Sequence, residues 1–142
     1  MTGRYDVIVI GGGHAGCEAA LASARMGCRT LLLSMNPDTV AHMPCSPSIG
    51  GIGKGHLVKE IDALGGEMAR VCDASAIQCK RLNTRKGAAV QGTRTQNDKV
   101  RYRTVMKHTL EQEPGLEIKQ AMVESFLLER SRARGVCDQT GA

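Results

Sequence analysis

Aromatic residues are almost absent from this 142-residue chain, which has no tryptophan, two tyrosines and one phenylalanine. This scarcity argues against the single-strand nucleic-acid binders that stack bases on aromatic side chains. Long apolar runs are also missing, and no stretch approaches the ~18 residues that a membrane span needs. No secretory leader precedes the first apolar stretch, Val7–Ile10, so we expect a cytoplasmic protein with no membrane partner.

Cysteine pairs of the form C-x-x-C are missing, although the chain has six cysteines. Because no secretory signal accompanies them, we expect reduced thiols rather than a disulfide framework. His42 and Cys45 form an H-x-x-C pair, but no second pair follows at zinc-ligand spacing. The sequence therefore predicts no metal site.

Acidic residues are scarce in one segment. From Lys80 to Lys107 there are nine basic residues and one acid, Asp98, so this segment has a net charge of +8. The rest of the chain carries −3, and the whole chain +5. Such an imbalance indicates a local polyanion-binding role. Three interpretations stay open: contacts to nucleic-acid phosphates, a solvated face, or a cofactor or substrate cleft that includes Lys86 and Arg94.

Glycine, in contrast, is abundant, with 17 copies, and three of them follow the first apolar run. The run Tyr5–Ile10 is rich in β-branched residues and predicts a buried strand. The alanine-rich stretch 15–26 predicts a helix that stops at Gly27. Thr30–Leu33 predicts a second strand. Together these elements predict a parallel βαβ unit with a right-handed crossover.

The remainder of the chain gives weaker helix and strand signals. A loop without regular structure is expected over 34–53, and loops of this length are often functional. The spacing of Leu57, Val58, Ile61 and Leu64 predicts one covered helix face. We expect helices at 54–64, 67–72 and 96–112, strands at 77–82, 116–120 and 123–128, and a polar hairpin loop at 130–135 before the start of another strand.

The segment Gly11–Gly16 fits the pattern G-x-G-x-x-G between a predicted strand and a predicted helix. Gly11 permits a tight turn, Gly13 lets the backbone approach a pyrophosphate, and Gly16 lets the helix pack close to the strand. The first turn of the helix then offers free N–H groups to phosphates. In this context the pattern predicts dinucleotide binding.

The acid that usually ends the second strand of such a unit is missing. Ser34 occupies this position, and its hydroxyl can bind a ribose without charge assistance. Asp38 lies beyond Pro37 and fits this role less well. The glycine pattern alone therefore leaves FAD and NAD open.

The proline-rich loop 43–56 contains Gly53 and Lys54 but is not a Walker A motif. Ser48 stands where that motif needs glycine, and Gly55 replaces the Ser or Thr that would hold magnesium. The loop therefore does not predict ATP or GTP hydrolysis.

Cys45 lies between two prolines in this loop, close in sequence to a predicted helix N-terminus. Lys54 and His56 lie close enough in the chain to assist it. Two interpretations stand at this point: an activated nucleophile, or the small buried thiol that is the common fate of cysteine.

These features together resemble the N-terminal part of the bacterial glucose-inhibited division protein A family. The glycine turn with His14 is shared with many flavoproteins, whereas the run Cys45–Gly66 is specific to the family. The similarity spans essentially the whole chain and includes Pro44 before this run and, after it, Leu82-Asn83, Lys86-Gly87, Arg94, Gln96, Asp98 and Tyr102.

The resemblance implies an α/β, Rossmann-like FAD-binding fold with a parallel sheet. Members of the family use NADH to reduce the flavin and a methylene-folate as one-carbon donor. With a GTPase partner they add a carboxymethylaminomethyl group at C5 of the wobble uridine of tRNA, and the full-length enzyme is expected to be a homodimer. By position, the resemblance implies FAD contacts for Gly11, Gly12, Gly13, His14, Ala15 and Gly16, a backbone contact of Val123 on the adenine side, and a catalytic role for Cys45.

The sequence also departs from the family. Ala88 stands where proline is usual, and Asn97 replaces a usual alanine. Family members are several times longer, so the chain looks like a truncated FAD-binding domain that is inactive and unstable alone. It would consist of a βαβ unit at 5–33, a loop at 34–53, a helical and basic segment at 54–112 and a β-rich end at 116–142.

Two alternative functions remain open. One is a folate-dependent flavoprotein tRNA methyltransferase or a generic FAD oxidoreductase, against which the run Cys45–Gly66 argues. The other is a non-catalytic nucleotide- or RNA-binding module, which the basic segment would serve.

Overall fold

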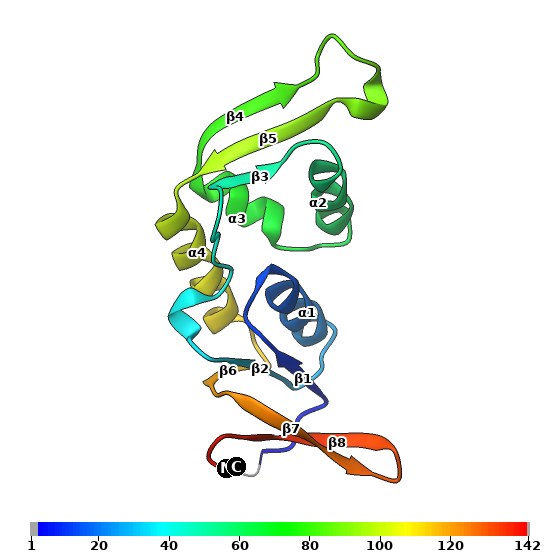
Figure 1. The fold of residues 1–142 in the computed structure, drawn as a ribbon, viewed down its shortest axis with the longest axis vertical. Coiled ribbons are helices and arrows are strands. Elements are labelled where there is room, and N and C mark those ends of the chain that lie inside the picture. The colour runs from blue at the N-terminus through cyan, green and yellow to red at the C-terminus, as the bar shows by residue number, and fades with distance from the viewer. Residues whose placement is uncertain (1–2, 142) are drawn as a thin grey trace. The chain divides into compact units, whose positions relative to one another are not determined.

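The computed structural model of the chain describes residues 3–141. They form two compact units (Figure 1). The first consists of the residues up to Val40 and those from Thr109 onward, and the second is Ala41–His108. The second unit is therefore inserted into the chain of the first.

A parallel three-stranded sheet forms the centre of the first unit. Its strands are β1 (Val7–Ile10), β2 (Thr30–Ser34) and β6 (Leu116–Gln120), in the order β1-β2-β6. All five residues of the central strand β2 are buried. Helix α1 (His14–Arg25) packs on one face of this sheet (Figure 1). This arrangement confirms the predicted βαβ unit and the α/β fold class.

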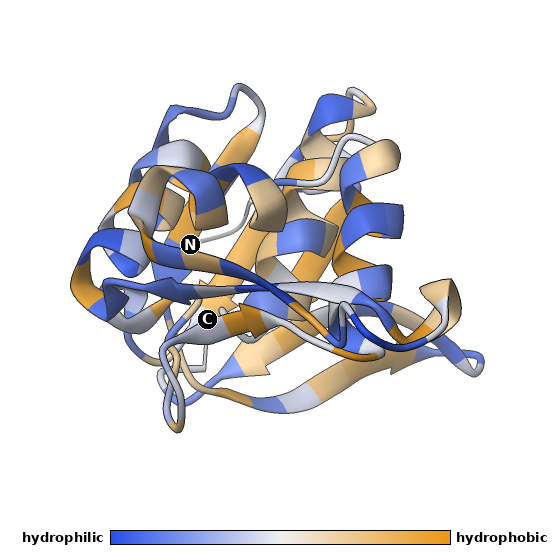
Figure 2. Ribbon diagram, turned by 90° about the horizontal axis from the view of Figure 1, so that it is seen from above, coloured by the Kyte–Doolittle hydropathy of each residue, from blue (hydrophilic) through white to orange (hydrophobic). Residues whose placement is uncertain are grey.

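Helix α1 ends where the sequence predicts. Met26 caps the helix, and Gly27 follows with a φ of +88°, a conformation that glycine adopts without a steric penalty. The helices contain both hydrophilic and hydrophobic residues (Figure 2).

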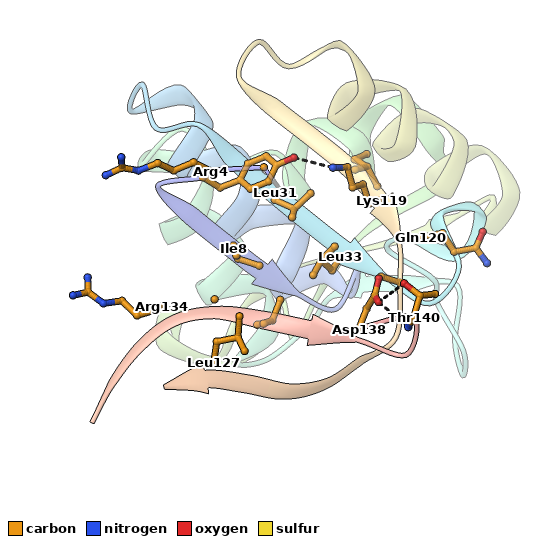
Figure 3. A pocket seen from close by; sticks show the side chains of 16 residues that line it. Arg4, Ile8, Leu31, Leu33, Lys119, Gln120, Leu127, Arg134, Asp138 and Thr140 are labelled. Atoms are coloured by element: carbon orange, nitrogen blue, oxygen red, sulfur yellow. Dashed lines mark hydrogen bonds between the residues drawn. The ribbon is translucent and has the colours of Figure 1, made fainter. Parts of the chain in front are cut away.

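A hairpin of β7 (Val123–Glu129) and β8 (Arg132–Asp138) lies on the face of this sheet opposite α1 (Figure 1). A cavity of about 890 Å³ separates the hairpin from the sheet, with Ile8, Leu31 and Leu33 on one side and Leu127 on the other (Figure 3). Arg130 and Ser131, both with positive φ, make the turn. The loop expected at 130–135 is thus shorter, because β8 begins at Arg132.

The second unit has an antiparallel sheet in the order β3-β5-β4. Its strands are β3 (Ser48–Gly50), β4 (Ala76–Leu82) and β5 (Gly92–Asn97). Two sequence predictions were wrong here. Strand β3 lies inside the segment 34–53, which was expected to lack regular structure, and strand β5 was not predicted. The remaining elements are α2 (Lys54–Ala63), α3 (Met68–Ser75), α4 (Lys99–Gln112), which runs on into the first unit, and the short 3-10 turns η1 (Pro37–Thr39) and η2 (Ala88–Val90).

Helix α2 does not bury the apolar face that its sequence predicts. Leu57 is 59% exposed and Leu64 90% exposed, and Gly55 is the buried residue of this helix. A Cβ atom at Gly55 would lie 3.1 Å from the carbonyl oxygen of Thr93, so the helix approaches β5 through its backbone. In α4, by contrast, Tyr102 and Leu110 are fully buried and His108 is exposed.

A buried polar network joins β5 to α3. The Asn97 amide donates to the carbonyl oxygen of Cys72 (2.7 Å) and to the hydroxyl of Ser75 (3.0 Å). The Thr95 hydroxyl donates to the Asn97 amide oxygen (3.0 Å) and lies 2.7 Å from the Cys72 sulfur. These four residues are at most 7% exposed. The interior of this unit is therefore held in part by hydrogen bonds whose partners are all internal.

A polar cluster at the start of β1 links it to β6. The Tyr5 hydroxyl donates to the Glu117 carboxylate and accepts from Lys119 (2.9 Å), whose ammonium also lies 3.1 Å from Glu117. The hydrogen bond from Tyr5 is the main reason why the pKa of Glu117 is lowered. The same hydroxyl is the main reason why the pKa of Lys119 is raised.

Within residues 3–141, no helix combines the length and the apolar composition that crossing a membrane requires.

We predict that Tyr5→Phe raises the pKa of Glu117 toward its ordinary value, because the main hydrogen bond to the carboxylate is lost. A carboxyl whose pKa is lowered on folding contributes stability above its unfolded pKa, and this contribution is lost as the pH falls through its folded pKa. The variant should therefore be less stable than the parent, and its deficit should be larger at about pH 7 than at about pH 2, where only the hydrogen bond from Lys119 to Tyr5 is still lost. Denaturant unfolding of both proteins at both pH values measures the stability difference, and an NMR titration of the Glu117 carboxyl carbon measures its pKa. An equal deficit at both values would contradict it.

We predict that Asn97→Ala lowers the free energy of unfolding by about 1–3 kcal/mol, because buried partners of the amide lose their hydrogen bonds. Gln78→Ala, at an exposed position of β4, is the matched control and should change it by less than about 0.5 kcal/mol. Urea unfolding of both variants measures the difference. Equal effects would mean that the network does not hold the unit together.

Candidate functional site

The glycine turn connects β1 to α1 at the carboxyl end of the parallel sheet. Gly11 has a φ of +101°, and its N–H donates to the carbonyl oxygen of Leu33 in β2 (2.8 Å). A Cβ atom at Gly16 would lie 1.9 Å from the carbonyl oxygen of Gly11, a distance at which no side chain fits. Gly16 thus allows α1 to begin directly against the turn, as its place in the pattern predicts.

Gly13, unlike Gly12 and Gly16, faces open space. A Cβ atom there would meet nothing within 4 Å, although the backbone (φ −71°, ψ 178°) suits any residue. Packing therefore does not require glycine at this position. Gly13 is also the N-cap of α1 and supplies no side-chain cap. The geometry fits a ligand that comes close to the backbone and accepts hydrogen bonds from the helix N-terminus.

Other predicted binding residues lie at the same end of the sheet. Ser34 ends β2, and its hydroxyl would be 3.1 Å from a Cβ atom at Gly12. This hydroxyl donates to the carbonyl oxygen of Asn36 (3.2 Å). The carbonyl oxygen of Ser34 accepts from the N–H of Ala121 (3.0 Å), two residues before Val123 at the start of β7. The structure thus brings the glycine turn, Ser34 and the beginning of β7 together.

Cys45 lies in the second unit, in the loop before β3, and is exposed. It is therefore not the buried thiol of the second interpretation. The Lys99 ammonium donates to the carbonyl oxygen of Cys45 (3.3 Å), and the Lys54 ammonium donates to that of Ser48 (3.1 Å). The N–H of Asn97 donates to the carbonyl oxygen of Pro47 (2.7 Å). Backbone contacts on both sides thus hold the loop that presents the thiol.

Lys99 is the contact that sequence reasoning missed. Lys54, one of the two residues that the sequence offered to assist Cys45, donates from its ammonium to the Ser48 carbonyl instead. Lys99 is separated from Cys45 by 54 positions, and only the return of the chain through β5 brings the two residues together. No local pattern signals such a pair.

Gly50, the last residue of β3 and four residues before Lys54, is required by the packing of the sheet. Gly50 has a φ of +99°, and a Cβ atom there would lie 2.2 Å from the carbonyl oxygen of Thr93. The close approach of β3 to β5 therefore requires glycine.

Within residues 3–141, no three His, Cys, Asp or Glu residues are grouped as metal ligands, and the six cysteines are free thiols.

Comparison with known proteins gives one consistent result. The sequence profile of the family described as "Glucose inhibited division protein A" matches residues 6–142. The tRNA uridine 5-carboxymethylaminomethyl modification enzyme MnmG of Syntrophobacter fumaroxidans is 70% identical over 138 residues. The enzyme of the same name from Protochlamydia amoebophila is 59% identical over 138 residues. Each match covers 97% of this chain, which spans about 22% of the length of these curated relatives.

Solved structures show the same similarity. A crystal structure of Aquifex aeolicus GidA is 52% identical, with a TM-score of 0.96 over 99% of this chain and 23% of that chain. A GidA-related protein from Thermus thermophilus is 21% identical with a TM-score of 0.65, covering 99% of this chain and 48% of its own, and shares the fold. The profile match and the identity along almost the whole chain agree: this chain belongs to the glucose inhibited division protein A family.

Proposed function

We propose that this chain is the dinucleotide-binding part of an enzyme that adds a carboxymethylaminomethyl group at C5 of the wobble uridine of tRNA. The names of its relatives support the reaction, since enzymes named for this modification are 57–70% identical to it. The open space at Gly13 supports dinucleotide binding from the geometry. That geometry is the single structural observation on which the proposal depends.

The cofactor of this proposal is FAD, bound at Gly11–Gly16. The turn fits a pyrophosphate because its glycines leave backbone N–H groups at the start of α1 uncovered by side chains. Ser34 would hold a ribose hydroxyl, and the backbone of Val123 would lie on the adenine side. A bound flavin supplies redox chemistry, for which NADH is the proposed reductant and a methylene-folate the proposed one-carbon donor.

Cys45 is the proposed catalytic thiol. Its exposure and its carbonyl contact with Lys99 support a thiol presented on a held loop rather than one packed in a core. The proposed partners are tRNA and the GTPase of the same modification pathway. The complete protein is proposed to act as a cytoplasmic homodimer.

The proposal is tested with the complete protein that carries this chain, the GTPase, and tRNA lacking the modification. Nucleoside mass spectrometry of the product should detect carboxymethylaminomethyluridine at the wobble position. Methylation of a uridine outside the anticodon would instead support the methyltransferase alternative. Unchanged tRNA would support the non-catalytic module.

We predict that Gly13→Ala weakens FAD binding by on the order of tenfold or more, because the methyl group projects toward the proposed pyrophosphate position. Folding stability should change by less than about 1 kcal/mol, since the methyl group meets no protein atom. Flavin absorbance after purification and unfolding curves measure the two effects. Gly16→Ala is the contrasting variant, because its methyl group overlaps the Gly11 carbonyl and should cost about 3 kcal/mol or more of stability. Undiminished flavin in Gly13→Ala would place the cofactor elsewhere.

We predict that Cys45→Ser keeps FAD bound but lowers tRNA modification by on the order of 100-fold, because a hydroxyl is a much weaker nucleophile than a thiol. Cys79→Ser is the matched control, since Cys79 is also an exposed thiol, and it should retain full activity. Turnover of unmodified tRNA and flavin content measure both effects. Full activity of Cys45→Ser would leave Cys45 with no catalytic part.

A further inference from the structure

Residues 76–97, which we name the basic ribbon, form β4, β5 and the loop between them. The ribbon contains no Asp or Glu. It has five basic residues, all of them exposed: Lys80, Arg81, Arg85, Lys86 and Arg94. In Figure 1 it is the two-stranded arm at the edge of the second unit.

The pairing of β4 with β5 places like charges next to each other. Lys80 and Arg94 are direct cross-strand partners, an arrangement that destabilises an antiparallel pair. None of the carboxylates within residues 3–141 forms an ion pair with any of the five cations. The ribbon therefore carries a repulsion that an external anion would relieve.

The two central cations lie on the face of the sheet turned away from α3. Thr95 points toward α3, where its hydroxyl lies 2.7 Å from the sulfur of Cys72. Because side chains alternate along a strand, its neighbours Arg94 and Gln96 lie on the opposite face. Lys80 and Gln78 are their partners across β4. This face thus presents two cations beside two amides, all of which can donate hydrogen bonds to phosphate and sugar oxygens.

We propose that the basic ribbon binds the phosphate backbone of the RNA substrate, an inference that rests on the proposed function. Five cations spread over two strands and a loop exceed what the two phosphates of one dinucleotide require, and they match a chain of phosphates. The ribbon contains no aromatic residue on which a base could stack. Its contacts are therefore to the backbone, independent of sequence and sensitive to salt.

The test uses the complete protein and measures tRNA affinity across a salt series. In Lys80→Gln with Arg94→Gln, the dissociation constant should rise about tenfold or more at low salt, and the slope of log Kd against log salt should fall by about 1–2. The control, Arg130→Gln with Arg132→Gln, removes the same charge from the exposed β7–β8 turn and should change neither. The ribbon variant should melt at or above the temperature of the parent, because the repulsion between its strands is removed.

If parent and ribbon variant show the same affinity and salt slope, the ribbon does not bind RNA, although the proposed function stands. If the variant instead loses its flavin, the cations serve the cofactor and the proposal is overturned. If the parent binds no tRNA, both proposals fail together. If the Lys80→Gln, Arg94→Gln variant melts at a lower temperature than the parent, a second variant, Arg85→Gln with Lys86→Gln, removes two charges from the loop of the ribbon without changing a strand. Unchanged tRNA affinity of this second variant would overturn the proposal.

Discussion

The contact between Gly16 and the carbonyl of Gly11 is the constraint on which the first unit depends. The helix can begin directly after the turn only because no side chain stands between them, at a point where a Cβ atom would come within 1.9 Å of backbone oxygen. This close approach places α1 against the fully buried strand β2 and aims its N-terminus at the carboxyl end of the sheet. The same small residues that permit packing leave Gly13 open, so the fold and the proposed binding site arise from one turn.

The second unit combines a buried apolar core with polar interior contacts. Asn97 and Thr95 connect β5 to α3, and the backbone of Asn97 also holds Pro47 in the loop that carries Cys45. Strand β5 therefore serves both the core and the exposed thiol. This explains how a unit with exposed leucines on α2 and an uncovered charged face keeps its loop in place.

The two units divide the proposed tasks. The first unit offers backbone N–H groups and the Ser34 hydroxyl, which are uncharged hydrogen-bonding groups suited to the proposed dinucleotide. The second offers a thiol and a dense set of cations, which suit chemistry on a polyanionic substrate. The chain belongs to the glucose inhibited division protein A family, and it spans about 22% of the length of its curated relatives.

The sequence by itself determined the βαβ unit, the glycine turn and the family, because these depend on local periodicity and on residues adjacent in the chain. It failed where long-range contacts decide. The strand β5, with the sequence Gly-Thr-Arg-Thr-Gln-Asn, has no apolar side chain to signal burial, and Asn97 is buried only because α3 supplies hydrogen-bond partners. The apolar spacing of α2 predicted a covered face that the structure leaves exposed, since the helix meets the sheet at Gly55. Only the tertiary structure placed Lys99 at Cys45 and Lys80 opposite Arg94, because chain reversal and strand register bring these distant residues together.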